Sequence, residues 1–144
     1  MSIAFTKVND FVEDLGNGVH DMDNDQLVIV LSNTAPSGES SDPTADGNGV
    51  LANVTQINHA NLSSRNLTTT SWSLSSGTAK LIIQDLTLTA SGVVPEFRYI
   101  YLYNDDATSD NLIGVYDLGV AKNMGDGDTF ICNFDDSAGV LTIT

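Results

Sequence analysis

Basic residues and cysteines are scarce in this sequence of 144 residues. Five Lys or Arg side chains stand against nineteen Asp or Glu, which gives a formal net charge of −14. We expect no nucleic-acid partner, because contacts to phosphates require clustered Lys or Arg. The single Cys132 cannot form an internal disulfide, and its alternation with Phe130 and Phe134 predicts a buried, unreactive thiol.

Long apolar runs and export signals are also missing from the sequence. No stretch approaches the length of a membrane-spanning helix, so we expect no membrane partner. The first ten residues, MSIAFTKVND, lack the basic and apolar segments of a secretory signal, which predicts a protein made in a cytoplasm without export. The length fits a single domain over residues 1–144 with its own core.

No motif of a known catalytic site occurs in the sequence. His20 and His59 are the only imidazoles, and neither has a Cys or His at zinc-binding spacing. The G-x-S-x-G elbow of hydrolases with a nucleophilic serine is missing, and no glycine-rich stretch has the phosphate-binding pattern. We therefore expect a protein that is not an enzyme and has no cofactor. A hydrolase using two Asp residues is the weakest alternative.

Asp21, Asp23 and Asp25 have the opening spacing of a calcium-binding loop. Gln26 and Ser32 stand where that loop requires Gly and Glu, so an EF-hand is rejected. Looser cation sites at the paired Asp residues of the loops stay an alternative. Because Asp in loops commonly stabilises turns and keeps a protein in solution, we favour that role and expect no metal.

The apolar pattern predicts a short helix near the N-terminus, followed by strands. Four apolar residues recur at helical spacing, with Thr6 as a cap and Gly16 as the end: Val8, Phe11, Val12 and Leu15. Gln26–Ser32 is a continuous apolar run, which is typical of a central strand covered on both faces. Residues 33–61 are mostly loop, with a helical turn at 50–57.

Further strands are expected at 64–74, 78–90, 129–134 and 140–143. The alternation in Thr78–Ala90 changes phase at Gln84–Asp85, which indicates a bulge or a bend at a sheet corner. The sequence DDSAG separates the last two strands as a hairpin loop. Seven or eight short strands with turn signals between them predict an all-β fold, a single antiparallel β-sandwich of jelly-roll type with a short N-terminal helix.

All four tyrosines lie in one stretch, FRYIYLYNDDATSDNLIGVYDLG at 97–119, which reads as two strands joined by an acidic loop. One antiparallel register sets Tyr103 opposite Leu112 and continues to Phe97 opposite Leu118, with Arg98 opposite Asp117. This register predicts an aliphatic face for the core: Ile100, Leu102, Ile113 and Val115. It also predicts an aromatic face, whose rings are the candidate interface residues: Phe97, Tyr99, Tyr101, Tyr103 and Tyr116.

Strands that are apolar on both faces must be covered twice. Tyrosine suits a contact surface, because it buries a large ring while its hydroxyl stays hydrogen-bonded. The second cover is therefore either another molecule or the protein's own helix and loops, and the sequence leaves both open.

Several stretches together resemble a family of small virion proteins of tailed bacteriophages. They are FTKVNDFVEDLGNGVHDMDNDQLVIVLSNTAP, ADGNGVLANVTQI, SGTAKLIIQDLTLTASG and the tyrosine-rich stretch. The resemblance covers most of the chain and implies a capsid decoration (cement) protein, or a tail-associated structural protein. It carries no catalytic residues.

The resemblance implies two partners: the major capsid protein and the chain itself, as a homodimer or homotrimer. The expected place is the capsid exterior of a virion assembled in the bacterial cytoplasm, because packaged DNA would repel an acidic protein. A carbohydrate-binding module with exposed Trp72 or tyrosines as sugar platforms is the alternative from another class.

Overall fold

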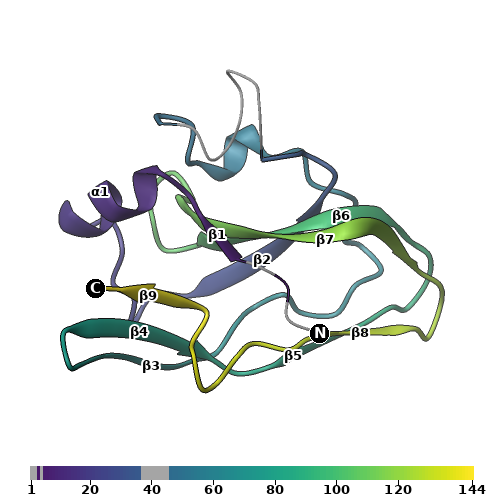
Figure 1. Cartoon of the computed structure of the whole chain (residues 1–144). Helices are drawn as coiled ribbons and strands as arrows, with labels where there is room; N and C mark the ends of the chain where they lie inside the picture. The colour runs from purple at the N-terminus through teal and green to yellow at the C-terminus, as the bar shows by residue number, and fades with distance from the viewer. Residues whose placement is uncertain (1–2, 4, 37–45) are drawn as a thin grey trace.

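The described residues fold mainly into antiparallel strands that lie in two layers (Figure 1). The computed structural model describes residue 3 and residues 5–36 and 46–144. One layer is a sheet in the order β1-β7-β6-β2, formed by Phe5–Lys7, Leu112–Met124, Val94–Asn104 and Leu27–Ser32. The other layer holds the sheet β3-β4-β9, formed by Thr69–Ser75, Thr78–Ile83 and Leu141–Ile143. It also holds the pair β5-β8, formed by Leu86–Thr89 and Thr129–Cys132. The predicted all-β class is confirmed.

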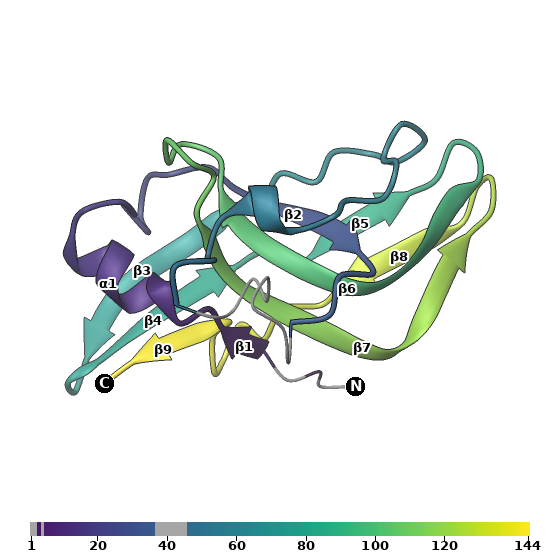
Figure 2. The ribbon, with the colours of Figure 1, turned by 90° about the horizontal axis from the view of Figure 1, so that it is seen from above.

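Three of the strand pairings are nested inside one another. β6 pairs with β7, β5 pairs with β8, and β4 pairs with β9, so residues 78–143 form one long antiparallel hairpin. Figure 2 shows both arms of this hairpin bending out of the β6–β7 sheet into β5 and β8. The predicted break at Gln84–Asp85 is confirmed, since β4 ends at Ile83 and β5 begins at Leu86. The hairpin predicted around DDSAG is wrong, because β8 and β9 each pair with an earlier strand instead of with one another.

The N-terminal helix begins later than predicted and ends at Gly16 as predicted, and one residue of its predicted apolar face is exposed. α1 spans Asp10–Gly16, while Thr6 belongs to β1 and caps nothing. Phe11 is fully buried, but Val12 is 47% exposed. The start moved because residues 5–7 pair with β7, so Val8 leaves the helical pattern and enters the core. The other predicted turn is present as a short 3-10 helix, η1, at Leu51–Asn53. The part of the predicted loop at 37–45 lies outside the described residues.

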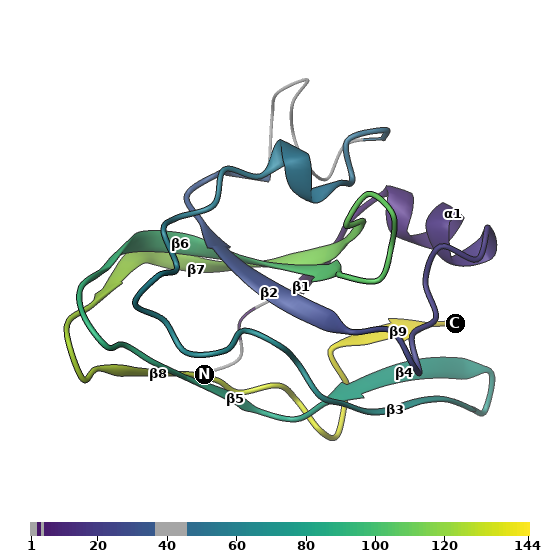
Figure 3. The same ribbon diagram turned by 180° about the vertical axis from the view of Figure 1, so that it is seen from behind.

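β2 is buried along its whole length, as its apolar run predicts, but it is an edge strand and not a central one. The chain segment at 56–67 lies along its outer side (Figure 3). Backbone N–H groups of Ile57 and Leu67 donate to the carbonyls of Leu31 and Leu27, at 3.0 and 2.9 Å. The edge is therefore closed by irregular chain that takes the place of a neighbouring strand.

Two side chains of this segment complete the β2 edge. His59 Nε2 accepts a hydrogen bond from the Leu31 N–H at 3.1 Å, and the Arg65 guanidinium donates to the Ile29 carbonyl at 2.7 Å. Burial of the ring and the nearby Arg65 charge lower the pKa of His59 from 6.5 to about 4. Protonation would place a donor against the Leu31 N–H, so the folded state holds His59 neutral.

We predict a pH-dependent loss of stability from His59. Its pKa is lower in the folded than in the unfolded chain, so its contribution is complete above pH 6.5 and is lost as the pH falls towards about 4. The residue is partly exposed, and with screening by solvent we expect a loss of roughly 1–2 kcal/mol. Urea unfolding at pH 7.5 and 5.0 measures it. His59→Gln keeps an acceptor without titrating and should remove this part of the pH dependence; an unchanged pH dependence in His59→Gln would contradict the assignment.

The register of the tyrosine-rich pair is predicted correctly at its loop end and is one residue off from Leu102 to Tyr99. It is wrong at Phe97, which lies opposite Lys122 and not Leu118. Tyr103 lies opposite Leu112, but Leu102 then lies opposite Gly114, so Ile113 is an extra residue on β7. The bulge shifts the pairing of β7 by one position as far as Asp117, and a second irregularity follows between Tyr99 and Phe97. Tyr99 instead of Arg98 therefore lies opposite Asp117.

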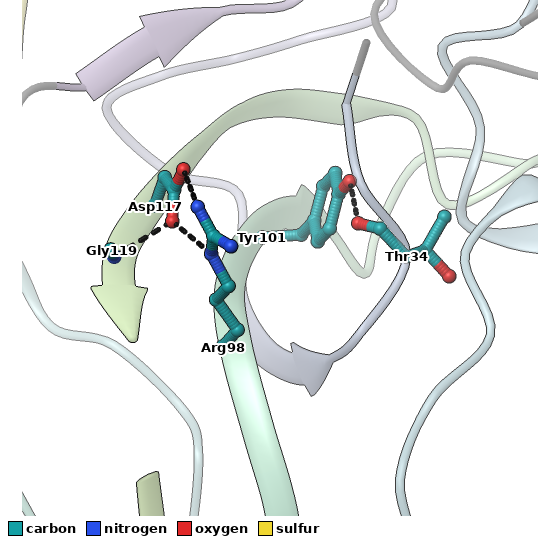
Figure 4. A network of polar contacts seen from close by, with 5 residues as sticks. All are labelled: Thr34, Arg98, Tyr101, Asp117 and Gly119. Atoms are coloured by element: carbon teal, nitrogen blue, oxygen red, sulfur yellow. Dashed lines mark hydrogen bonds and ion pairs between the residues drawn. The ribbon is translucent and has the colours of Figure 1, made fainter. Parts of the chain in front are cut away.

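The predicted pair of Arg98 and Asp117 nevertheless forms across this shifted register (Figure 4). Two hydrogen bonds of 2.8 and 3.0 Å join the guanidinium to the carboxylate, and the Gly119 N–H donates to the same carboxylate at 2.8 Å. These contacts lower the pKa of Asp117, with Arg98 as the largest cause. The long arginine side chain reaches a diagonal neighbour as easily as a direct one, so the pair forms although the predicted register is wrong here.

Two apolar clusters lie on opposite faces of the four-stranded sheet. The larger one, between the two layers, includes Phe97, Ile100, Leu102 and Ile113, and Tyr116 packs against it. The smaller one, which we name the tyrosine cluster, consists of Val8, Val28, Val30, Val54, Tyr99, Tyr101, Tyr103, Leu112 and Val115, with Leu51 packed against it. The protein's own residues around η1 therefore supply the second cover of the hairpin.

Candidate functional site

A cavity of about 670 Å³ opens between β1 and β7 of one layer and β8 with the following segment of the other. Its apolar wall includes the rings of Phe5, Tyr116, Phe130 and Phe134. Asp135 and Asp136 also line it. We name this cavity, with these six residues, the aromatic cleft.

The rings of the aromatic cleft come from both layers and touch across it. The centroids of Phe5 and Tyr116 lie 5.0 Å apart at 54°, and those of Tyr116 and Phe134 lie 6.2 Å apart at 51°. Phe130 stands edge-on to the buried Phe97 at 5.6 Å. Such tilted ring pairs are stabilising contacts, so the wall is a fixed apolar surface.

Two groups in the cleft carry protons that they do not lose at neutral pH. Burial raises the pKa of the Tyr116 hydroxyl, with Cys132 as a smaller cause. Burial followed by the Asp85 charge raises the pKa of the Cys132 thiol to about 12. The thiol is 8% exposed, and its sequence-based assignment as a buried, unreactive group is consistent with this environment.

The two carboxylates of the cleft differ in what they bind. Asp135 accepts the N–H groups of Ala138 and Ser137, at 2.7 and 2.8 Å, and these bonds lower its pKa. It therefore fixes the turn after Phe134. Asp136 makes no hydrogen bond or ion pair within the described chain and is exposed. A charge at this rim is thus available to a ligand from outside.

The predicted interface rings lie inside the protein. Phe97 and Tyr101 are 0% exposed, and Tyr99 and Tyr103 are 7% exposed. Phe97 and Tyr116 pack with the larger core, contrary to the predicted aromatic face, because the bulge at Ile113 and the irregularity near Phe97 change which face each residue joins. The tyrosine cluster would reach a second molecule only if residues 50–57 moved away. Tyr116 differs from the others, because it lines the aromatic cleft.

Several acidic side chains outside the cleft stabilise turns. Asp21 accepts the N–H groups of Asp23 and Asn24 at 3.1 and 3.2 Å, and Asp10 accepts those of Gly47 and Gly49. Within residues 3, 5–36 and 46–144, no three His, Cys, Asp or Glu side chains gather as a metal site would require. Asp21 and Asp10 thus have the turn role that Asp commonly has in loops.

His20 is buried at 5% exposure and stacks on Phe11 at 5.3 Å. Its Nδ1 faces the Asn104 side chain at 3.1 Å, while Nε2 has no hydrogen-bond partner in the described part of the chain. Burial lowers the pKa of His20, against the opposing charges of Asp14 and Asp25. The Asn104 amide also donates to Asp25 at 2.6 Å, so this group ties the loop before β2 to the end of β6.

Trp72, the sugar platform of the alternative hypothesis, is only partly exposed. It lies on β3 opposite Leu81 and packs against the larger core. The tyrosines of the same hypothesis are buried, with the partial exception of Tyr116. The described chain therefore presents no open row of aromatic rings over these residues.

Sequence reasoning did not find the aromatic cleft. Its residues come from β1, β7 and the chain at 130–140, which are far apart in the sequence. The signal that was present is the alternation of Phe130, Cys132 and Phe134 followed at once by two carboxylates. That pattern was interpreted as a hairpin strand, because the partner of β8 could not be read from the sequence.

Comparison with known protein families, curated proteins and solved structures found no match. No helix of the described residues is long and apolar enough to cross a membrane. The geometry thus defines an acidic all-β protein whose aromatic cleft offers apolar contact and an outward-facing charge.

Proposed function

We propose that the chain is a structural protein of a tailed-bacteriophage virion, a capsid decoration protein that binds the outer surface of the major capsid shell and stabilises it. The observation that carries this proposal is the chemistry of the aromatic cleft. Its rings offer apolar contact and Asp136 offers charge, which are properties of an attachment surface. We propose no enzymatic activity.

The charge of the chain supports a place on the outside of the shell. At −14, it would be repelled by the phosphates of packaged DNA in the lumen. The resemblance of the LSNTAP, FRYIYLYND and LIGVYDLG stretches to phage virion proteins points to the same class. We also propose that the fold is a sandwich of jelly-roll type, as expected for such a protein. The two layers and the nested hairpin are consistent with this fold.

Stabilisation of the shell follows from mass action. A protein that binds the assembled shell but not its dissociated subunits shifts the equilibrium towards the shell. Copies placed around a local symmetry axis of the shell would contact each other, so we propose a homodimer or homotrimer in the bound state.

We predict that quantitative mass spectrometry of purified virions finds this chain in a fixed, simple ratio to the major capsid protein. Shells from a phage that lacks the gene should release their DNA at a lower temperature, because the added binding energy is gone. Restoring the protein in trans to the purified shells should recover the wild-type temperature. A few copies per particle would contradict the cement role and favour a tail-associated structural protein.

A further inference from the structure

The lower wall of the aromatic cleft is the edge of a strand. Phe130, Ile131, Cys132 and Asn133 all line the cavity, although successive side chains of a strand point to opposite faces. A cavity that touches both sets must face the edge of β8 and not one of its faces. β5 pairs with β8 on one side, and within the described residues no strand pairs with it on the other.

An unpaired edge exposes backbone groups that can bind another strand. In an antiparallel pair, about half of the N–H and C=O groups of each strand point away from the partner. We infer that along β8 these groups face the cleft, whose lining also includes the rings of Phe5 and Tyr116. Ile131 adds apolar surface at this edge, because 60% of its side chain is exposed. Neither proline nor lysine occurs in β8 to block a further strand.

The charge of the cleft selects among possible occupants. Its titratable lining groups are Asp135, Asp136, Tyr116 and Cys132, and none of them is basic. Lys80 lies beside the rim, where its ammonium donates to the Ser137 carbonyl at 2.7 Å and, after the backbone hydrogen bonds, helps to lower the pKa of Asp135, so Asp136 is the carboxylate left for a ligand. A second copy of this chain would bring a formal charge of −14 and few lysines or arginines to an acidic rim. A segment with basic residues is the complementary occupant.

We propose that the aromatic cleft binds an extended, basic peptide arm of another protein, which adds to the free edge of β8 as a strand. One apolar side chain of the arm inserts between Phe5, Tyr116 and Phe134, and a Lys or Arg pairs with Asp136. Main-chain hydrogen bonds supply affinity in this mode, and the pocket and charge supply specificity. The inference rests on the proposed function for the source of the arm, which is a subunit of the capsid shell.

The first test uses a peptide probe with the ¹⁵N-labelled full chain. The probe is an octapeptide of alternating valine and lysine, and its control carries glutamate in place of lysine. We expect the lysine peptide to shift the amide resonances of residues 130–133 and 136 at millimolar concentration, and the glutamate peptide to shift them at least about tenfold less. No shift at residues 130–133 at 1 mM lysine peptide, or equal shifts with both peptides, would overturn the inference.

The second test uses shells purified from a phage that lacks the gene. On binding of the chain to these shells, amide hydrogen exchange at residues 130–133 should slow about tenfold or more. Binding without slower exchange there would overturn the inference and leave the proposed function standing. No binding to shells would refute the proposed function, and the NMR titration with the two octapeptides would then decide the inference alone. Slower exchange that depends on the concentration of the isolated chain would show a second copy in the cleft and overturn it.

Two matched pairs of variants localise the contact. Asp136→Lys should weaken binding to shells about tenfold, while Asp126→Lys makes the same charge change at an exposed residue outside the cleft and should not. Ile131→Ser should weaken binding about tenfold, while Leu74→Ser removes similar surface at a residue that is 72% exposed and should not. Equal effects within both pairs would overturn the inference.

Discussion

Replacing Tyr101 by Ala is expected to lower the free energy of unfolding by about 3–5 kcal/mol, as for other large-to-small changes in a core. Tyr101 is 0% exposed and lies in the tyrosine cluster, between the sheet and the residues around η1. Its hydroxyl donates to the Thr34 carbonyl at 2.6 Å (Figure 4). The substitution would remove the ring that fills this face and leave that carbonyl without its donor.

Urea unfolding of the purified chain measures this effect, and Tyr101→Phe separates its two parts. The phenylalanine variant keeps the ring and loses the hydrogen bond, so we expect a loss of only about 1 kcal/mol. Leu74→Ala, at a residue that is 72% exposed, should change stability by less than about 0.5 kcal/mol. If the tyrosines instead formed the contact with a partner, Tyr101→Ala would weaken binding and leave the stability of the isolated chain unchanged.

Gly114→Ala is expected to lower the free energy of unfolding by about 3 kcal/mol, the upper part of the usual range for overpacking. A Cβ atom at this position would lie 2.7 Å from the Thr6 carbonyl oxygen and would overlap the Phe5 ring. A backbone oxygen cannot turn aside as a side chain can, so β1 must move away from β7. Phe5 would then leave the wall of the aromatic cleft.

The control for this variant is Gly16→Ala at the end of α1. A Cβ atom there meets nothing within 4 Å, and the residue does not have a positive φ, so we expect no loss of stability. Urea unfolding compares the two variants, and NMR of the Phe5 ring reports whether β1 detaches. A Gly114→Ala protein as stable as Gly16→Ala would show that β1 does not require this close approach.

Local patterns were enough to predict much of the fold. The apolar run at 27–32 identified a strand covered on both faces, and the phase change at Gln84–Asp85 located the break between β4 and β5. The clustering of tyrosines showed that the β6–β7 pair needs two covers. These features follow from the composition of a few neighbouring residues, which fixes how a segment must be buried.

Features that depend on distant partners were not predictable in the same way. The bulge at Ile113 has no mark in the sequence, and it alone decides whether Val115 or Tyr116 joins the tyrosine cluster. The start of α1 depends on the pairing of residues 5–7 with β7. The aromatic cleft likewise exists only because β1 and the chain after β8 lie on the same side of the two layers.

The nested pairing of residues 78–143 also sets an order of assembly. Only the short loop at 105–111 separates β6 from β7, so this pair has the smallest loop-closure entropy of the three nested pairs. Once it forms, β5 can meet β8 across two short corners, and β4 can then meet β9, although Ala79 and Ile143 are far apart in sequence. The tyrosine-rich pair is thus suited to act as the folding nucleus. The cleft wall at 130–140 includes residues of the outer strand β8, so a half-folded molecule has no aromatic cleft.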